Sequence, residues 1–210
     1  MRQKRTNLFA EPSVGIHRNW LALWGLLIAT GLLWMTAFSM SPGLEADPLL
    51  ERPAQSMVFF SEDVPTLVLF LHPRCPCTQP TMGALKKLIS RKHDMVVQPV
   101  FYLPGTMEDS WARADYWDRV IALGAHQPMI DVDGAFAKKF HVTTSGHAIL
   151  FSVDGSVLYS GGITGGRVHE GDNMGLTKLN RVLDGVPVED PRFPVYGCSI
   201  VKKERSGHEH

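Results

Sequence analysis

The sequence has no excess of either charge, because its 21 basic and 21 acidic residues cancel to a formal net charge of zero. A protein that binds nucleic acid or a strongly acidic substrate needs a concentration of positive charge, so we expect no nucleic-acid partner. No segment repeats along the chain, which argues against a repeat architecture. The remaining composition, with 44% hydrophobic and 20% charged residues, is typical of one globular domain with a single core.

Charge is also missing from a long apolar stretch, WLALWGLLIATGLLWMTAFSM, at residues 20–40. This length is about what a helix needs to cross the hydrocarbon core of a bilayer. Basic residues precede the stretch and acidic residues follow it, so the positive-inside rule places residues 1–19 in the cytoplasm. The sequence predicts a single-pass membrane protein whose domain lies outside the cytoplasm, on the periplasmic side.

A cleaved signal peptide is the alternative, since Ala37 and Ser39 are small residues at plausible cleavage positions. We favour the anchor because the apolar stretch is long for a signal peptide. No cysteine follows closely enough to be a lipid attachment site. Both interpretations export the domain to a compartment where disulfides persist.

Beyond the span, residues 41–56 are rich in proline and acidic residues and lack periodicity, which predicts a linker. The folded domain is expected at residues 57–201, followed by a polar, disordered tail at residues 202–210. A continuous apolar run at residues 66–72 predicts a buried strand. From Thr78 onward, apolar residues recur at helical spacing and predict an amphipathic helix.

Further elements follow from periodicity and turn signals. In chain order they are a strand at residues 95–103 with Pro99 suggesting an edge or irregularity, a helix from Asp109 or Ser110 to Gly124 with Trp111 and Trp117 in the core, a short helix at 134–140, a hairpin at 147–161, and a helix from Asp172 or Asn173 to Gly185.

Only three cysteines occur in the chain, and two of them lie in LFLHPRCPCTQPTM, where the first strand gives way to the first helix of the domain. A helix N-terminus exposes unpaired N–H groups that stabilise a thiolate, and Arg74 adds a cation. We therefore predict that Cys75 is the more exposed and more readily ionised sulfur, suited to attack a disulfide. Cys77 is a candidate resolving thiol, although a ring closed around Pro76 would be strained.

Cys198, the third cysteine, lies in FPVYGCSI and leaves an odd number. It is free, paired with Cys75 or Cys77, or paired between molecules. Its neighbourhood indicates a final strand or docking segment, and we expect it to pack near the CPC motif. Either Cys77 or Cys198 could then resolve a mixed disulfide.

The element order and the cysteine placement together resemble the thioredoxin fold, in particular the membrane-tethered, exported thioredoxin-like proteins of the TlpA and ResA type. Their active-site pattern, F-W-A-x-W-C-P-P-C-x-x-E-x-P, can be laid on FLHPRCPCTQPTMGAL without a gap. Cys75 then matches the nucleophilic cysteine, whereas Thr78 occupies the place of the second and Cys77 stands one residue earlier. A branch known as RedB is similar in its CPC motif and its HEGDN loop.

The resemblance implies an α/β, three-layer thioredoxin-like domain of the order β-α-β-α-β-β-α behind one transmembrane helix. It implies thiol-disulfide exchange with protein thiols or disulfides outside the cytoplasm, without a cofactor. Such proteins carry a cis-proline facing the cysteines, and here Gly146 occupies that place with His147 after it. Gly146 and His147 are thus expected beside Cys75, where they would contact a substrate together with Arg74.

Two alternatives remain for the cysteines. Cys75 and Cys77 are soft ligands that could hold copper or zinc together with His72 or His147, as in a metal-binding or metal-delivery module. An adaptor that uses the fold without redox chemistry is the other.

The glycine-rich stretch GGITGGRVHEGDNMG, residues 161–175, lacks the Walker lysine spacing and does not predict a nucleotide site. It is either an ordinary loop that ends in a helix cap at Asp172 or Asn173, or a loop whose His169 and Glu170 fold over the cysteines.

Overall fold

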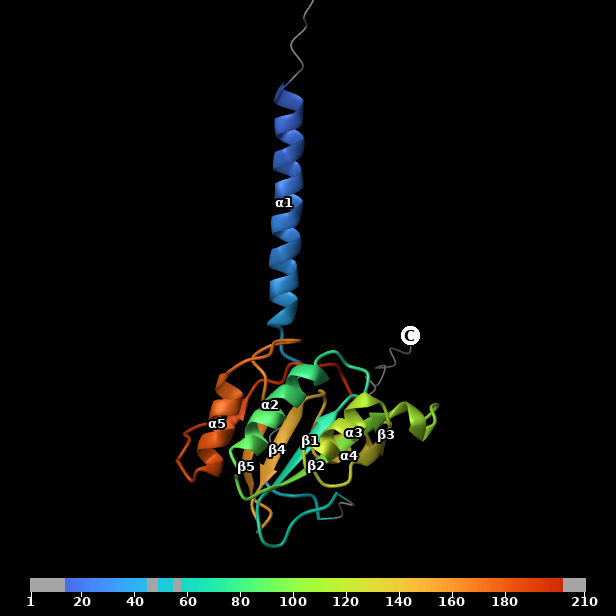
Figure 1. Cartoon of the computed structure of the whole chain (residues 1–210), viewed down its shortest axis with the longest axis vertical. Helices are drawn as coiled ribbons and strands as arrows, with labels where there is room; N and C mark the ends of the chain where they lie inside the picture. Colours follow the sequence, from blue (N-terminus) through green and yellow to red (C-terminus); the bar gives the residue numbers. More distant parts are fainter. Residues whose placement is uncertain (1–13, 45–48, 55–57, 202–210) are drawn as a thin grey trace, which may run out of the picture. The chain divides into compact units, whose positions relative to one another are not determined.

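A computed structural model describes residues 14–44, 49–54 and 58–201 of the chain (Figure 1). The chain divides into two compact units, residues 1–38 and residues 39–210. The predicted tail at 202–210 and most of the predicted cytoplasmic segment lie outside the described residues.

The described part of the first unit lies in one helix, α1 (Val14–Ser39). Within it, residues Asn19–Ser39 have a mean hydropathy of 1.9 and are long and apolar enough to cross a membrane by length and composition. Large apolar side chains along this stretch are exposed, among them Trp24 and Trp34. An exposed apolar surface of this extent is typical of a segment that meets lipid or an export machinery.

The second unit is built on a sheet whose described strands have the order β3-β2-β1-β4-β5-β6. The strands are β1 (Thr66–Leu71), β2 (Val96–Leu103), β3 (Met129–Val132), β4 (His147–Phe151), β5 (Val157–Gly162) and β6 (Arg192–Phe193). β1, β2 and β3 run parallel, β4 is antiparallel to β1, and β4 and β5 form the predicted hairpin. Every residue of β1 is buried, because both faces of the central sheet are covered.

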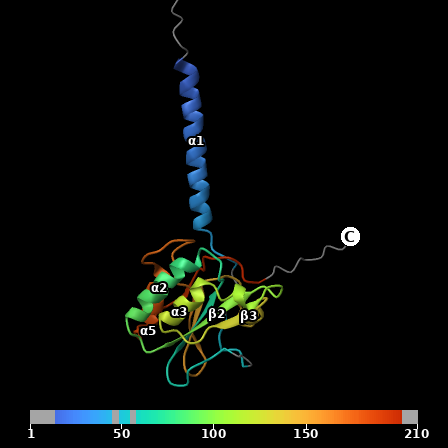
Figure 2. The same ribbon diagram turned by 45° about the vertical axis from the view of Figure 1, so that its right-hand side comes forward.

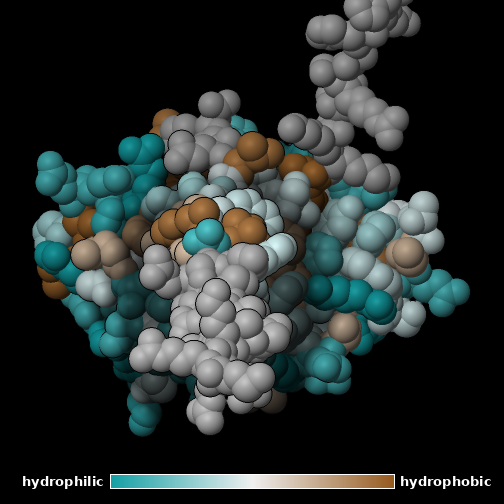
Figure 3. Space-filling model, turned by 90° about the horizontal axis from the view of Figure 1, so that it is seen from above, coloured by the Kyte–Doolittle hydropathy of each residue, from teal (hydrophilic) through white to brown (hydrophobic). Residues whose placement is uncertain are grey.

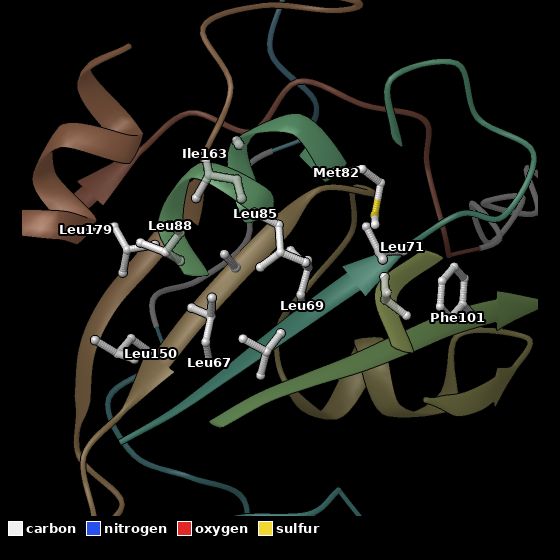
Figure 4. Packing of buried hydrophobic residues seen from close by; sticks show 14 of the residues in the cluster. Leu67, Leu69, Leu71, Met82, Leu85, Leu88, Phe101, Leu150, Ile163 and Leu179 are labelled. Atoms are coloured by element: carbon white, nitrogen blue, oxygen red, sulfur yellow. The ribbon is translucent and has the colours of Figure 1, made fainter. Parts of the chain in front are cut away.

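Helices pack on both faces of the sheet, more of them on one face than on the other, which makes three layers. α2 (Thr78–Ser90), α3 (Asp115–Ala122) and α5 (Met174–Leu183) pack on one face, and α4 (Ala135–Lys139) packs on the other. α2, α3 and α5 lie together in Figure 2. Leucines of β1 meet Met82, Leu85 and Leu88 of α2 in the larger core (Figure 4). On the side shown in Figure 3, hydrophilic side chains predominate over the domain surface.

This arrangement is a thioredoxin-like fold, and the predicted order β-α-β-α-β-β-α is confirmed. The short strands β3 and β6 extend the sheet at its two edges; β3 is not predicted, and β6 is shorter than, and lies at the start of, the final strand or docking segment expected around Cys198. β3 has four residues and contains a buried acid, Asp131, so it lacks a strand-like apolar run. The Asp131 carboxylate accepts the N–H groups of Phe136 (2.7 Å) and Ala137 (3.0 Å), which satisfies the first turn of α4.

Two local predictions need correction. Of the two alternatives for Pro99, an edge strand is excluded because β2 lies between β1 and β3, and Pro99 is tolerated because β3 pairs with β2 only from Val100 onward. The helix predicted from 109 to 124 is divided into a 3₁₀ turn (Asp109–Trp111) and α3, with Ala114 extended between them. Trp117 is buried in the core as predicted, whereas Trp111 is only partly buried.

Described parts of the predicted linker are docked on the domain. The Gly43 N–H donates to the Val195 carbonyl (2.7 Å), and the Arg52 N–H donates to the Gly155 carbonyl (2.8 Å). These backbone groups are therefore satisfied by the domain rather than by water alone.

Candidate functional site

The CPC motif forms the turn that leads from β1 into α2. The His72 carbonyl accepts hydrogen bonds from the Cys75 N–H (3.2 Å) and from Oγ1 of Thr78 (2.8 Å), and the Cys75 carbonyl accepts the Thr78 N–H (2.9 Å). Cys77 is the N-cap residue of α2 and makes no side-chain cap hydrogen bond. The predicted start of the helix at Thr78 is confirmed, and both cysteines lie at its N-terminal end.

Cys198 reaches the same place from the other end of the domain. The Ser145 N–H donates to the Cys198 carbonyl (2.8 Å), and the Ser145 hydroxyl accepts the His72 N–H (2.8 Å). A side chain on Gly197 would collide with the Ser145 carbonyl, so the close approach of this segment requires glycine there. One serine thus ties the segment of Cys198 to the turn of Cys75.

The three thiols are free and interact with one another. Cys75 is hydrogen-bonded to Cys198, and this contact, followed by burial, raises the pKa of the Cys75 thiol. The same hydrogen bond lowers the pKa of Cys198 to about 7. Burial, followed by the charge of Cys75 and a hydrogen bond to it, raises the pKa of Cys77. The expectation that Cys198 packs near the CPC motif is confirmed.

The predicted character of Cys75 is wrong. Its exposed fraction is 1%, that of Cys77 is 5%, and Cys198 is partly exposed. The Arg74 guanidinium lies over the Trp111 ring at 5.1 Å and is not among the groups that shift the pKa of Cys75. The contact between Cys75 and Cys198 raises the pKa of Cys75 and lowers that of Cys198, so the direction of the shifts favours the thiolate on Cys198.

Arg167 supplies positive charge at the cluster and was not predicted. Its Nη1 donates to the Gly197 carbonyl at 2.6 Å, next to Cys198. Its charge lowers the pKa of both Cys198 and Cys77, as a smaller contribution than those named above. The only sequence signal was an arginine inside the glycine-rich loop, far from all three cysteines in the chain.

The glycine-rich loop runs along α2. Glu170 accepts a long hydrogen bond from Gln79 in the first turn of α2 (3.5 Å), and Asp172 forms an ion pair with Lys87 (3.0 Å). The loop ends at Asn173, whose side chain accepts the Leu176 N–H (2.9 Å), so the predicted cap of α5 is confirmed.

Gly146 lies close to α2, whereas the side chain of His147 lies on the opposite face of the sheet. Gly146 has a φ of +90°, and a Cβ there would stand 3.3 Å from Oγ1 of Thr81, in the first turns of α2. The expectation that His147 lies beside Cys75 is wrong, because side chains alternate along β4 and Ala148 takes the face under α2. The His147 ring instead contacts Oγ of Ser160 (2.8 Å), and burial lowers its pKa to about 4.

The metal alternative finds little support in this arrangement. Nδ1 of His72 accepts the Arg74 N–H (3.2 Å), and the His72 ring stacks on Tyr102 (centroid distance 5.6 Å) and meets Trp111 edge to face (5.5 Å). The His147 side chain lies on the face of the sheet opposite to α2 and the CPC motif. Within residues 14–44, 49–54 and 58–201, no three His, Cys, Asp or Glu side chains gather in a group that could hold a metal ion.

Fold and site define a thioredoxin-like domain with three interacting thiols at the N-terminal end of the helix that follows its central strand. No protein-family model matches the chain, and no curated protein matches it.

Solved structures do resemble it. An uncharacterized conserved protein from Geobacillus kaustophilus is 18% identical, with a TM-score of 0.59 over 79% of this chain and 99% of that chain. A hypothetical protein from Sinorhizobium meliloti 1021 is 20% identical, with a TM-score of 0.56 over 79% of this chain and 97% of that chain. A thioredoxin-like protein from Aeropyrum pernix is 15% identical, with a TM-score of 0.42 over 77% of this chain and 98% of that chain. The first two likenesses show the fold alone, and a fold of this kind does not determine a function.

Proposed function

We propose that the protein is a thiol-disulfide oxidoreductase. The observation that carries the proposal is that Ser145 ties the segment of Cys198 to the turn of Cys75 and Cys77, so that cysteines from two segments far apart in the chain lie close enough to shift one another's pKa. Isolated structural cysteines are buried and inert, whereas a partly exposed thiol with a lowered pKa is suited to exchange. Cys198 has both properties, and Cys75 is the thiol in contact with it.

The proposal includes the location of the domain. The apolar α1, with basic residues before it and acidic residues after it, supports a single membrane anchor of a TlpA/ResA-like protein whose domain lies outside the cytoplasm. In that compartment protein disulfides persist, so exported protein thiols or disulfides are the expected partners.

Exchange activity tests the first part. We expect the reduced full chain, in detergent, to reduce the disulfides of insulin, and we expect the triple variant C75S/C77S/C198S to do so at least about a hundredfold more slowly, because a serine hydroxyl does not attack a disulfide. The measurement is the rate of insulin precipitation, with circular dichroism as a control for folding. Equal rates for the two proteins would contradict the proposal.

Labelling in cells tests the second part. We expect a membrane-impermeant maleimide to label Cys198 in intact spheroplasts, because the domain lies outside the membrane barrier. As a matched control, a cysteine introduced as N7C into the triple variant should be labelled only after lysis. Labelling of Cys198 only after lysis would place the domain in the cytoplasm, and a mature mass lacking the apolar stretch would show cleavage instead of anchoring.

A further inference from the structure

We infer that Cys198 is the sulfur that attacks the partner, that Cys75 is the resolving thiol, and that Arg167 is a positioning residue for Cys198. This inference rests on the proposed function and assigns roles within it. It reverses the roles that the CPC motif suggests, in which the first cysteine of the motif attacks.

Access decides between the sulfurs. An attacking sulfur has to approach the partner's disulfide along the S–S axis, so it needs an open side. Cys75 is 1% exposed and Cys77 is 5% exposed, whereas Cys198 is partly exposed at the surface of the cluster. Of the three cysteines, Cys198 is therefore the residue with surface open to a protein partner.

Charge and hydrogen bonding favour the same sulfur. The Cys75 thiol is hydrogen-bonded to Cys198, and this contact stabilises a thiolate on Cys198 while it holds the proton on Cys75. Arg167 donates to the carbonyl of Gly197, the residue before Cys198, and adds positive charge beside the sulfur. Both contributions lower the pKa of Cys198, which favours its thiolate over that of an ordinary cysteine at neutral pH.

The backbone holds this sulfur in place. The Cys198 carbonyl accepts the Ser145 N–H (2.8 Å). Two residues further along each segment, the Ile200 N–H donates to the Thr143 carbonyl (3.0 Å). An isolated bridge between Thr144 and Ser199 completes the pairing of the two segments. Cys198 is thus fixed on a paired segment and does not depend on a loose tail for its position.

The reaction balances in two steps. The Cys198 thiolate attacks one sulfur of the partner's disulfide, so a Cys198–partner mixed disulfide forms and the other partner sulfur leaves as a thiolate. That thiolate, or water, takes the proton from Cys75, and the Cys75 thiolate then attacks Sγ of Cys198. The partner sulfur that was bound to Cys198 leaves as a thiolate, and a Cys75–Cys198 disulfide remains. The protein dithiol loses two electrons, and the partner's disulfide gains them.

Reaction of the reduced full chain with 5,5′-dithiobis-(2-nitrobenzoate) tests the order of events. We expect C75S to retain one thionitrobenzoate adduct, located on Cys198 by peptide mass spectrometry. We expect C198S to form an adduct on Cys75 at least about tenfold more slowly at pH 7 than wild type forms one on Cys198, because the remaining thiols are buried and protonated. An adduct on Cys75 of C198S at the wild-type rate would overturn the inference.

The pH dependence of Cys198 modification tests the role of Arg167, because a residue with a merely structural role would not shift its midpoint. R167Q should move the midpoint of Cys198 modification to higher pH, R167K should restore it, and R74Q, which removes the same charge beside Cys75, should leave it in place. An unchanged midpoint in R167Q would remove Arg167 from the assignment. Insulin reduction equal in wild type and the triple variant would instead reject the proposed function, so the two failures are distinguishable.

Discussion

Replacement of Cys75 by alanine is expected to slow the alkylation of Cys198 at pH 7 by about fifteenfold. In the intact cluster the pKa of Cys198 is about 7, mainly because of its hydrogen bond with Cys75. Without that contact the pKa should rise at least to the ordinary value, at which roughly 3% of a cysteine is thiolate at pH 7. The measurement is the rate of iodoacetamide modification of Cys198 between pH 5 and 10, followed by peptide mass spectrometry.

C75S is the matched control for this substitution. A serine hydroxyl can still donate a hydrogen bond to Cys198, so the upward shift of the midpoint should be smaller in C75S than in C75A. Both variants lack the resolving thiol, and the difference between them therefore isolates the hydrogen bond. If C75A and wild type had the same pH profile, Cys75 would not be the group that activates Cys198.

Acidification from pH 7 to pH 4 is expected to lower the free energy of unfolding through His147 by at most about 3 kcal/mol, since the residue is partly exposed and solvent reduces the effect of burial. Burial lowers the pKa of His147 to about 4, whereas in an unfolded chain it is about 6.5. Between these values the unfolded state binds the proton and the folded state does not. The stabilisation is therefore fully present above pH 6.5 and is lost as the pH falls towards 4, which urea unfolding at a series of pH values would measure.

H147Q separates this effect from that of the carboxylates. The glutamine amide can still contact Oγ of Ser160, which is 2.8 Å from the histidine ring, but it does not titrate. The variant should lose most of the dependence between pH 6.5 and pH 4 while other groups titrate as before. A slope identical to that of wild type would mean that folding does not change the pKa of His147.

The framework of the domain could be predicted because its elements have clear periodicities. β1 is a continuous apolar run, α2 repeats its leucines at helical spacing, and the Asp154–Gly155 turn connects β4 with β5. β3 was missed because a short strand with a buried acid carries no such pattern. Edge strands of this kind are determined by their neighbours in the sheet rather than by their own residues.

The members of the site were predicted better than their roles. All three cysteines were named, but the ionisation of Cys75 was inferred from a helix terminus and from Arg74, both local in sequence. The structure decides it through a contact with Cys198 and through burial, neither of which is visible in the residues next to Cys75. Arg167 was missed for the same reason, since only tertiary structure brings it beside Gly197.

Ser145 offers a spectroscopic signal of the redox state. Its amide N–H and its hydroxyl serve the two segments that would be cross-linked, so any change in their separation alters the geometry of both hydrogen bonds. In a ¹⁵N-labelled sample, the amide resonances of Ser145 and His72 should therefore move together when the protein passes from dithiol to disulfide, and they would allow a redox titration to be followed without a substrate.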